Sequence, residues 1–258
     1  MFYQKIIPLK ELDKFGSVNN LNEQAKTLVK QQKKSWALAR KNYEALGKVE
    51  NRTFDFGYYK IKIQHNPERI RSSAAKTDAK SIAERQCFLC PANLPGEQKG
   101  ILFTKKYLIL TNPFPIFQTH LTISELEHTP QQVIPFFADM LQLSRELYDF
   151  TVFYNGPKTG ASAPDHFHFQ AGETGLLPVE HDVETLLKNK SCTLVEKDTL
   201  QISATENYLR RIFVIQSTKI DPLKKAFEFI VQHLPAEEDE EPLISLLSSY
   251  KNGKWRVI

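Results

Sequence analysis

The clearest pattern of polar and apolar positions lies near the middle of the chain, where two histidines and a glutamine alternate with two phenylalanines. The residues are His166, Phe167, His168, Phe169 and Gln170. Side chains of a β-strand point alternately to its two faces. The pattern therefore predicts a strand that turns the phenylalanines into the core and gathers the two imidazoles and the carboxamide on the opposite face.

A loop of small residues precedes this strand. It contains Asn155, Gly156, Gly160 and Ser162. Such residues let backbone N–H groups approach an anion closely. We therefore expect a phosphate-binding loop that leads into the strand with the two histidines, and we expect the functional site of the protein here.

Apolar positions recur at near-helical spacing from Asn20 to Leu46, and Asn20 or Asn22 can cap the start of the predicted helix. The stretch from Arg52 to Gln64 alternates with a period of two, but its apolar face changes at Gly57. This change predicts two strands of a hairpin, or one strand with a bulge at the glycine.

The rest of the chain predicts a mixture of strands and helices. Strands are expected at residues 101–110, 119–124, 150–155, 166–171 and 211–216, with a hairpin over 192–197 and 200–204. Helices are expected at residues 129–148, 183–189, 222–234 and 242–250. The chain stops inside an apolar β run at 254–258, so we expect a native C-terminal extension.

We interpret these elements as one α+β domain. A helical segment at residues 1–50 is expected to pack on a catalytic core at 51–175. Residues 176–258 are expected to form an α/β elaboration of the same domain.

Composition and charge narrow the class of protein. The 258 residues are 41% hydrophobic and 25% charged, with a net charge of +4, which is ordinary for a soluble globular protein. The basic residues form no stripe that would bind nucleic acid, although the charge is compatible with an anionic small substrate. No apolar run reaches the about 20 residues of a membrane span, and the first residues lack the pattern of a signal peptide. We expect a cytoplasmic protein.

Cysteine and histidine spacing indicates a metal site. Cys87 and Cys90 form a C-x-x-C, the spacing at which two thiolates bind one zinc from a tight turn. His120 at a strand start and His166 in the central strand would complete a tetrahedral structural site, although His120 could also be an ordinary imidazole at a strand edge. The other histidines are interpreted as surface residues: His65, His128, His181 and His233.

His168 is the histidine that remains as a candidate for catalysis. An imidazole near its neutral pKa is a competent nucleophile toward phosphorus. Donors to the phosphate oxygens are expected from Asn155, Ser162, Gln170 and the backbone amides at 160–162. The alternative is a half-buried strand with polar residues on its wet face. Three basic residues of the loop before the C-x-x-C are further candidates for contacting phosphate or base, or are ordinary surface: Arg69, Arg71 and Lys76.

The stretch GASAPDHFHFQ resembles the active-site strand of the histidine-triad superfamily, in the branch whose third histidine is a glutamine. That branch contains galactose-1-phosphate uridylyltransferase, diadenosine tetraphosphate phosphorylase and GDP-hexose phosphorylase. CFLCPANLPGE resembles the opening of its zinc-containing members, and NPFPIFQTHLTIS resembles their strand with a histidine before an apolar run. The resemblance covers Thr53 to Gly172 and implies an antiparallel sheet with flanking helices.

The resemblance also implies roles for single residues. His168 would be the nucleophile that takes up a nucleoside monophosphate, with Gln170 assisting at the phosphate. Asn155 and Ser162 would contact phosphates. The zinc ligands that it implies are Cys87, Cys90, His120 and His166. Asp165 and Phe167 stand where the uridylyltransferases carry prolines, which favours a phosphorylase or an adenylyltransferase-like activity.

We therefore expect a nucleotidyltransferase or phosphorylase for a nucleotide sugar or a dinucleoside polyphosphate. After His168 takes the nucleotide, orthophosphate or a sugar 1-phosphate would accept it. Two alternatives stay open: a hydrolase of the same fold, and an inactive nucleotide-binding zinc protein. A homodimer is an expectation from the relatives, and neither nucleic acid nor a membrane is an expected partner.

Overall fold

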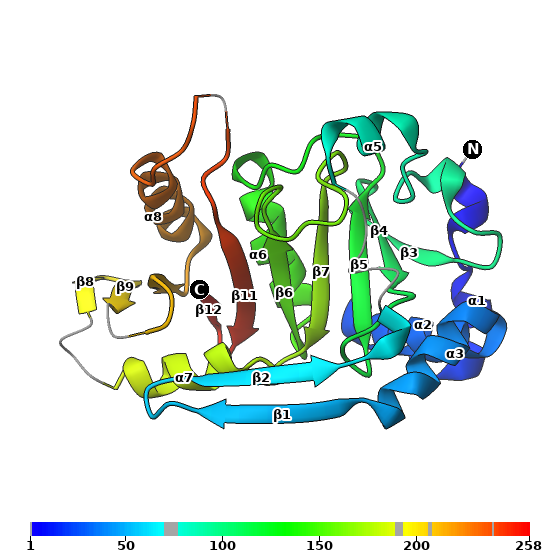
Figure 1. Cartoon of the computed structure of the whole chain (residues 1–258), viewed down its shortest axis with the longest axis horizontal. Helices are drawn as coiled ribbons and strands as arrows, with labels where there is room; N and C mark the ends of the chain where they lie inside the picture. Colours follow the sequence, from blue (N-terminus) through cyan, green and yellow to red (C-terminus); the bar gives the residue numbers. More distant parts are fainter. Residues whose placement is uncertain (1, 70–76, 189–192, 206–207, 239) are drawn as a thin grey trace.

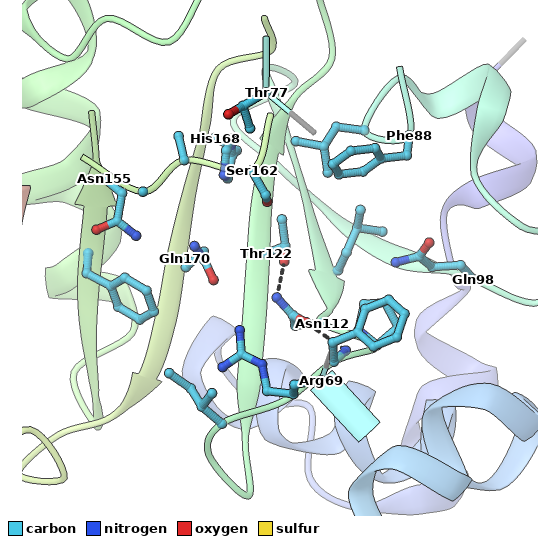
Figure 2. A pocket seen from close by; sticks show the side chains of 18 of the residues that line it. Arg69, Thr77, Phe88, Gln98, Asn112, Thr122, Asn155, Ser162, His168 and Gln170 are labelled. Atoms are coloured by element: carbon cyan, nitrogen blue, oxygen red, sulfur yellow. Dashed lines mark hydrogen bonds between the residues drawn. The ribbon is translucent and has the colours of Figure 1, made fainter. Parts of the chain in front are cut away.

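The computed structural model describes residues 2–69, 77–188, 193–205, 208–238 and 240–258. Its main feature is an antiparallel sheet of ten strands in the order β3-β4-β5-β7-β6-β11-β12-β10-β9-β8 (Figure 1). Helices α2, α6 and α8 pack on this sheet. A cavity opens over its strands β4 to β7 (Figure 2). This arrangement confirms the expected α+β class.

The bounds of the elements are as follows. The strands are β1 (Glu50–Asp55), β2 (Lys60–His65), β3 (Gly100–Phe103), β4 (Tyr107–Thr111), β5 (His120–Glu125), β6 (Phe150–Asn155), β7 (His168–Glu173), β8 (Thr193–Lys197), β9 (Leu200–Thr205), β10 (Ile212–Ser217), β11 (Ser245–Lys251) and β12 (Lys254–Val257). The helices are α1 (Leu9–Leu12), α2 (Leu21–Ser35), α3 (Ala37–Ala45), α5 (Ala79–Glu84), α6 (Phe137–Glu146), α7 (Pro178–Leu186) and α8 (Ile220–Gln232). None of the helices in the described ranges has the length and apolar character needed to cross a membrane.

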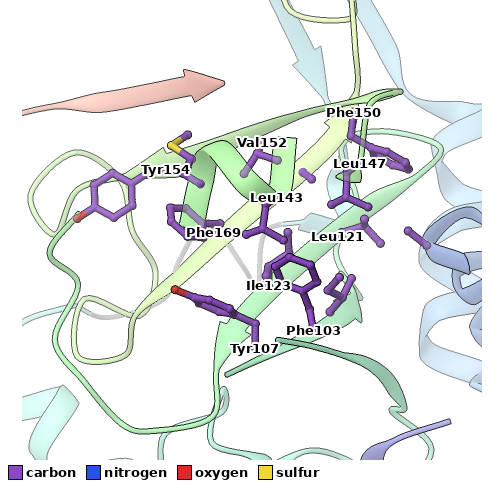
Figure 3. Packing of buried hydrophobic residues seen from close by; sticks show 14 of the residues in the cluster. Phe103, Tyr107, Leu121, Ile123, Leu143, Leu147, Phe150, Val152, Tyr154 and Phe169 are labelled. Carbon is purple, nitrogen blue, oxygen red and sulfur yellow. The ribbon is translucent and has the colours of Figure 1, made fainter. Parts of the chain in front are cut away.

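The two faces of β7 differ as its alternation predicts. Phe169 is fully buried, and so is Phe167 just before the strand; their rings meet edge to face at 4.9 Å. They belong to the main apolar cluster, which the neighbouring strands and α6 complete (Figure 3). Burying one such side chain stabilises the fold by about 1.5–3 kcal/mol. His168 and Gln170 point to the cavity instead.

The predicted long N-terminal helix is two helices, α2 and α3. Asn20 caps α2 as expected, since its side chain accepts a hydrogen bond from the Glu23 N–H at 2.9 Å. Trp36 then takes an extended conformation and ends α2. Its side chain is buried in the main cluster, so packing of the indole outweighs continuation of the helix at this residue.

The expected hairpin around Gly57 is confirmed. Strands β1 and β2 pair antiparallel and form a separate two-stranded sheet, which runs along the lower edge in Figure 1. Gly57 takes a positive φ of 83° in the turn. The hairpin is tied to α7, because the Lys60 N–H donates to the Asp182 carboxylate at 3.1 Å.

Two predicted elements between residues 101 and 148 are shorter than expected. The single strand at 101–110 is the hairpin of β3 and β4, because Thr104 and Lys105 both take positive φ values and turn the chain. The helix at 129–148 is reduced to α6 and the preceding 3₁₀ turn η6 (Ile134–Phe136). The chain before η6 is a loop, and it proves important for the site.

The predicted helix at 242–250 is wrong. Strand β11 occupies this segment and pairs with both β6 and β12. Asn252 and Gly253, which have positive φ values of 53° and 76°, form the turn into β12. The C-terminal strands therefore extend the sheet directly from the strand that carries Asn155.

Candidate active site and metal cluster

A cavity of about 1160 Å³ lies over the face of the sheet opposite α6 (Figure 2). Alternate residues of four adjacent strands form its floor. They are Leu110, Thr122, Phe153, His168 and Gln170. The small-residue loop after β6 and the segment around Phe88 form parts of its wall. The cavity has the size of the sites that bind drug-sized ligands and cofactors.

His168 presents one particular nitrogen to this cavity. Its Nδ1 lies 2.9 Å from the carbonyl oxygen of His166. A carbonyl can accept but not donate, so Nδ1 carries the proton and the lone pair of the neutral ring is on Nε2. Burial, with a smaller effect of the His166 charge, lowers the pKa of His168 to about 4. The ring is therefore neutral at pH 7, in the form required of a nucleophile.

Gln170 is oriented by His120, which lies on the neighbouring strand β5. Nδ1 of His120 accepts a hydrogen bond from the Ile116 N–H at 3.3 Å. Its Nε2–H therefore donates to Oε1 of Gln170, at 3.0 Å. This fixes the carboxamide with its oxygen toward His120, and its NH₂ group is left as the donor for a ligand. Burial, followed by the charge of Arg69, lowers the pKa of His120 to about 3.

The polar wall of the cavity contains the predicted phosphate-binding residues. Asn155, Gly160 and Ser162 all line it, and the side chains of Asn155 and Ser162 lie near His168 in Figure 2. The predicted set of backbone donors needs one correction. The N–H of Ala161 is directed to the carbonyl of Gly156 at 3.4 Å, because the loop closes on itself there.

The basic loop contributes Arg69 to the cavity. Arg69 lies in the turn η4 (Pro67–Arg69), on the β5 side of the floor in Figure 2. Burial lowers the pKa of its guanidinium, which nevertheless stays charged because an unperturbed arginine titrates far above neutral pH. The other two basic candidates, Arg71 and Lys76, lie outside the described residues.

The wall farther from His168 is largely apolar. Leu38, Phe88, Pro113 and Phe114 contribute to it, with Gln98 as a polar group. The Phe88 side chain is 43% exposed. Flat apolar side chains beside a hydrogen-bonding carboxamide suit a heterocyclic ring, which needs both stacking and edge contacts.

Four metal-ligating side chains come together beside the start of β7. They are Cys87, Cys90, His128 and His166, and their ligand atoms lie within 4.8 Å of one another. Nδ1 of His166 is 3.3 Å from Sγ of Cys87, and Nδ1 of His128 is 3.2 Å from Sγ of Cys90. A tetrahedral zinc with bonds of about 2.0–2.3 Å separates its ligands by about 3.3–3.8 Å. The four residues therefore fit one metal ion.

The groups around this cluster prepare it for a cation. Nε2–H of His166 donates to the Glu125 carbonyl at 2.8 Å and lies 3.0 Å from the Ser124 hydroxyl, so Nδ1 is the nitrogen with the lone pair. Burial raises the pKa of Cys87, but hydrogen bonding and the charge of His166 outweigh it and lower that pKa to about 6. Asp165 lies 3.8 Å from Nε2 of His128, too far for a hydrogen bond, and adds a negative charge beside the cluster.

The structure groups a set of four residues that differs from the predicted ligand set in one histidine. His120 is tied to Gln170 and Ile116, and His128, which we expected at the surface, takes its place. His128 is half exposed, so its polar loop was interpreted correctly. A loop can nevertheless fold back over a C-x-x-C turn, and the sequence around His128 carries no spacing that predicts this.

The architecture is a histidine-triad-like fold, with the antiparallel sheet, the Cys/His cluster and the histidine-bearing strand in one unit. The chain belongs to the DUF4922 family, a domain of unknown function, whose sequence profile matches residues 28–173. The match includes the metal cluster and the cavity floor and ends before the C-terminal strands. No curated protein matches the chain in sequence.

Solved structures resemble this one at low sequence identity. Yeast Ap4A phosphorylase Apa2 is 16% identical with a TM-score of 0.51, over 86% of this chain and 79% of that chain. Its complex with Ap4A is 17% identical, with a TM-score of 0.45 over 88% and 80% of the two chains. A DUF4931 family protein from Bacillus cereus ATCC 10987 is 13% identical, with a TM-score of 0.47 over 62% and 84%. At these identities the likeness is one of fold.

Proposed function

We propose that the chain is a nucleotidyltransferase or phosphorylase that acts through a covalent nucleotidyl intermediate on His168. The observation that carries this proposal is the state of that imidazole. It is neutral, its tautomer is set by the His166 carbonyl, and its Nε2 belongs to a ring that lines a large cavity. The fold shared with yeast Ap4A phosphorylase supports the same class of substrate.

The chemistry takes two balanced steps. First, Nε2 of His168 forms a bond to the α-phosphorus while the bond from that phosphorus to the leaving oxygen breaks, and the leaving phosphate keeps the electron pair. Second, an oxygen of orthophosphate or of a sugar 1-phosphate bonds to the phosphorus, and the N–P bond breaks. Each step then has a lower barrier than a direct transfer between two anions.

Charge in these steps develops on the phosphate oxygens. Four groups that can donate to phosphate line the same cavity as His168: the NH₂ of Gln170, the side chains of Asn155 and Ser162, and the guanidinium of Arg69. Donors that are held before the substrate arrives stabilise such charge without reorganisation. The apolar wall around Phe88 would then receive the base.

The cysteine–histidine cluster is proposed to hold a structural zinc. Its four protein ligands complete a tetrahedral shell, whereas catalytic zinc sites keep a position for water or substrate. The metal would fasten three segments that are distant in sequence, namely the C-x-x-C turn, the loop of His128 and the start of β7.

The test is intact-mass detection of the nucleotidyl adduct. Purified protein is incubated with ATP, Ap4A, GDP-hexose and UDP-hexose, each without an acceptor. We expect one donor to add a single nucleoside monophosphate, and we expect orthophosphate or a sugar 1-phosphate to remove it. His168→Asn is expected to abolish the adduct and to lower turnover by about 10⁴-fold or more.

His181→Asn is the matched control, because His181 is exposed on α7 and does not line the cavity. It should behave as wild type. Release of the nucleotide by water at the same rate with and without acceptor would favour the hydrolase. Tight nucleotide binding with no adduct from any donor would contradict the proposal and favour a binding protein.

A further inference from the structure

Gln131 lies in the loop between β5 and η6 and is buried, with 1% of its surface exposed. Its side chain reaches the backbone of two strands at once. Oε1 accepts from the N–H of His168 at 2.9 Å. Nε2 donates to the carbonyl oxygens of His168 and Asn155, both at 3.0 Å. One carboxamide therefore contacts the backbone of two residues that we place at the site.

These contacts occur where the pairing of β6 and β7 stops. The antiparallel register runs from Phe150 opposite Glu173 to Phe153 opposite Gln170. Continued by two residues, it would pair Asn155 with His168. Instead, the carboxamide of Gln131 takes the place of this pair and bonds to both backbones, as a peptide group would in the sheet.

The orientation of the carboxamide follows from its partners. The opposite orientation would place Oε1 against two carbonyl oxygens and Nε2 against an N–H group, so no bond would form. The loop itself is also anchored. The backbone N–H of Gln131 donates to Pro164 at 3.1 Å, and the N–H of Val133 donates to the Glu241 carboxylate at 2.6 Å.

We propose that Gln131 is a positioning residue for the reaction. It separates the ends of β6 and β7, which makes room for phosphate between Asn155 and His168, and it holds the backbone of His168 so that Nε2 meets the phosphorus in line. The inference rests on the proposed function of His168. Gln131 itself does not line the main cavity, so its effect is exerted through the two residues it binds.

Three variants separate this role from simple packing. Gln131→Met keeps the length of the side chain and removes all three hydrogen bonds. Gln131→Glu keeps an acceptor for the His168 N–H and removes the donors to both carbonyls. Gln132→Met is the matched control, because Gln132 is the adjacent glutamine and is exposed.

The first measurement is the rate of adduct formation with the donor that labels wild type, together with kcat and KM. For Gln131→Met we expect a loss of about 100-fold in both rates, since misplacing a reacting group by about 1 Å costs this much. KM should change by less than about 3-fold, because the donors to the ligand remain. The two rates of Gln131→Glu should lie between those of Gln131→Met and those of wild type. The rates of Gln132→Met should match those of wild type.

The second measurement needs no activity. ¹⁵N NMR of the imidazoles reports the tautomer of His168, and hydrogen exchange reports protection of its amide. In Gln131→Met we expect loss of amide protection and a mixture of His168 tautomers, with the metal still bound. If wild type forms no adduct, the proposed function fails. The spectra still test whether Gln131 fixes the backbone and the tautomer of His168. Unchanged spectra and rates in folded Gln131→Met would overturn the inference.

Discussion

His166 and His168 are two residues apart, yet different ring nitrogens carry the lone pair in the two side chains. In the metal cluster, Nε2 of His166 is held by the Glu125 carbonyl, and Nδ1 faces the two thiols. At the cavity, Nδ1 of His168 is held by a carbonyl, and Nε2 carries the lone pair. The difference shows that the reactive nitrogen of each histidine is selected by the backbone carbonyl within reach of the other nitrogen.

The two regions are also coupled, because the carbonyl that holds His168 belongs to His166. A metal bound to the His166 side chain would restrain that peptide group and so would restrain the proposed nucleophile. Burial disfavours charge in both places, so it favours the neutral ring of His168 and raises the pKa of Cys87. At Cys87 the hydrogen bond and the charge of His166 outweigh burial and favour the thiolate, which suits a cation. The predictions below test whether the two histidines have separate roles and whether metal binding at His166 affects His168.

Loss of the metal should have the largest effect. An ion that binds the folded state alone stabilises it by about 4 kcal/mol at 1,000 times its Kd. We therefore expect chelation, or the Cys90→Ala substitution, to lower the free energy of unfolding by about this amount, measured by urea denaturation with metal content determined in parallel. Adduct formation on His168 should fall as well.

Added zinc should restore the chelated protein but not Cys90→Ala. If the metal-free protein had the stability and activity of the holoprotein, the cluster would be neither structural nor coupled to the nucleophile.

The next effect distinguishes the two candidate histidine ligands. His128→Gln removes one proposed ligand, and we expect the Kd for zinc to rise by about 100-fold or more, at or above the largest losses caused by replacing a residue that is hydrogen-bonded to a ligand. His120→Gln should leave the zinc Kd unchanged, because His120 contacts Gln170 and Ile116. It should instead lower the rate of adduct formation, since the Gln170 carboxamide loses its orientation.

Competition with a chromophoric chelator measures the zinc Kd of each of the two variants. The reverse result, with weak binding in His120→Gln and normal binding in His128→Gln, would restore the ligand set that the sequence suggested.

This pair of histidines also shows where prediction from sequence stops. The C-x-x-C and the alternation of His168 with two phenylalanines are local patterns, and local patterns predicted the two cysteines of the cluster and the face on which His168 lies. His120 and His128 are not distinguished by local spacing, because each reaches its partner across the sheet or through a loop. Gln131 was missed for the same reason, since a lone glutamine in a loop gives no sign that it bonds to two strands.

The C-terminal strands show a different kind of error. Residues 242–250 were predicted as helix, although Asn252-Gly253 is a strong hairpin signal between two runs that can form strands. Short apolar runs fit both the period of an α-helix and the period of a β-strand. The pairing of β11 with β6 and β12 decides the outcome, and such pairing between segments distant in sequence is not visible in either run.

The smallest predicted effect concerns Ser124, whose hydroxyl lies 3.0 Å from Nε2 of His166 and donates to the Leu89 carbonyl at 3.2 Å. Ser124→Ala removes these two contacts and the 3.1 Å contact of the hydroxyl with the Glu125 carbonyl, but it leaves the bond from His166 to that carbonyl. The tautomer of His166 should therefore persist, and we expect zinc affinity to fall by about 10-fold, the low end for outer-shell partners. Adduct formation should stay near the wild-type rate when zinc is saturating, because His168 keeps its own carbonyl. A strong loss of activity in the zinc-loaded variant would mean that Ser124 acts on the cavity directly, and the separation between the two histidines would fail.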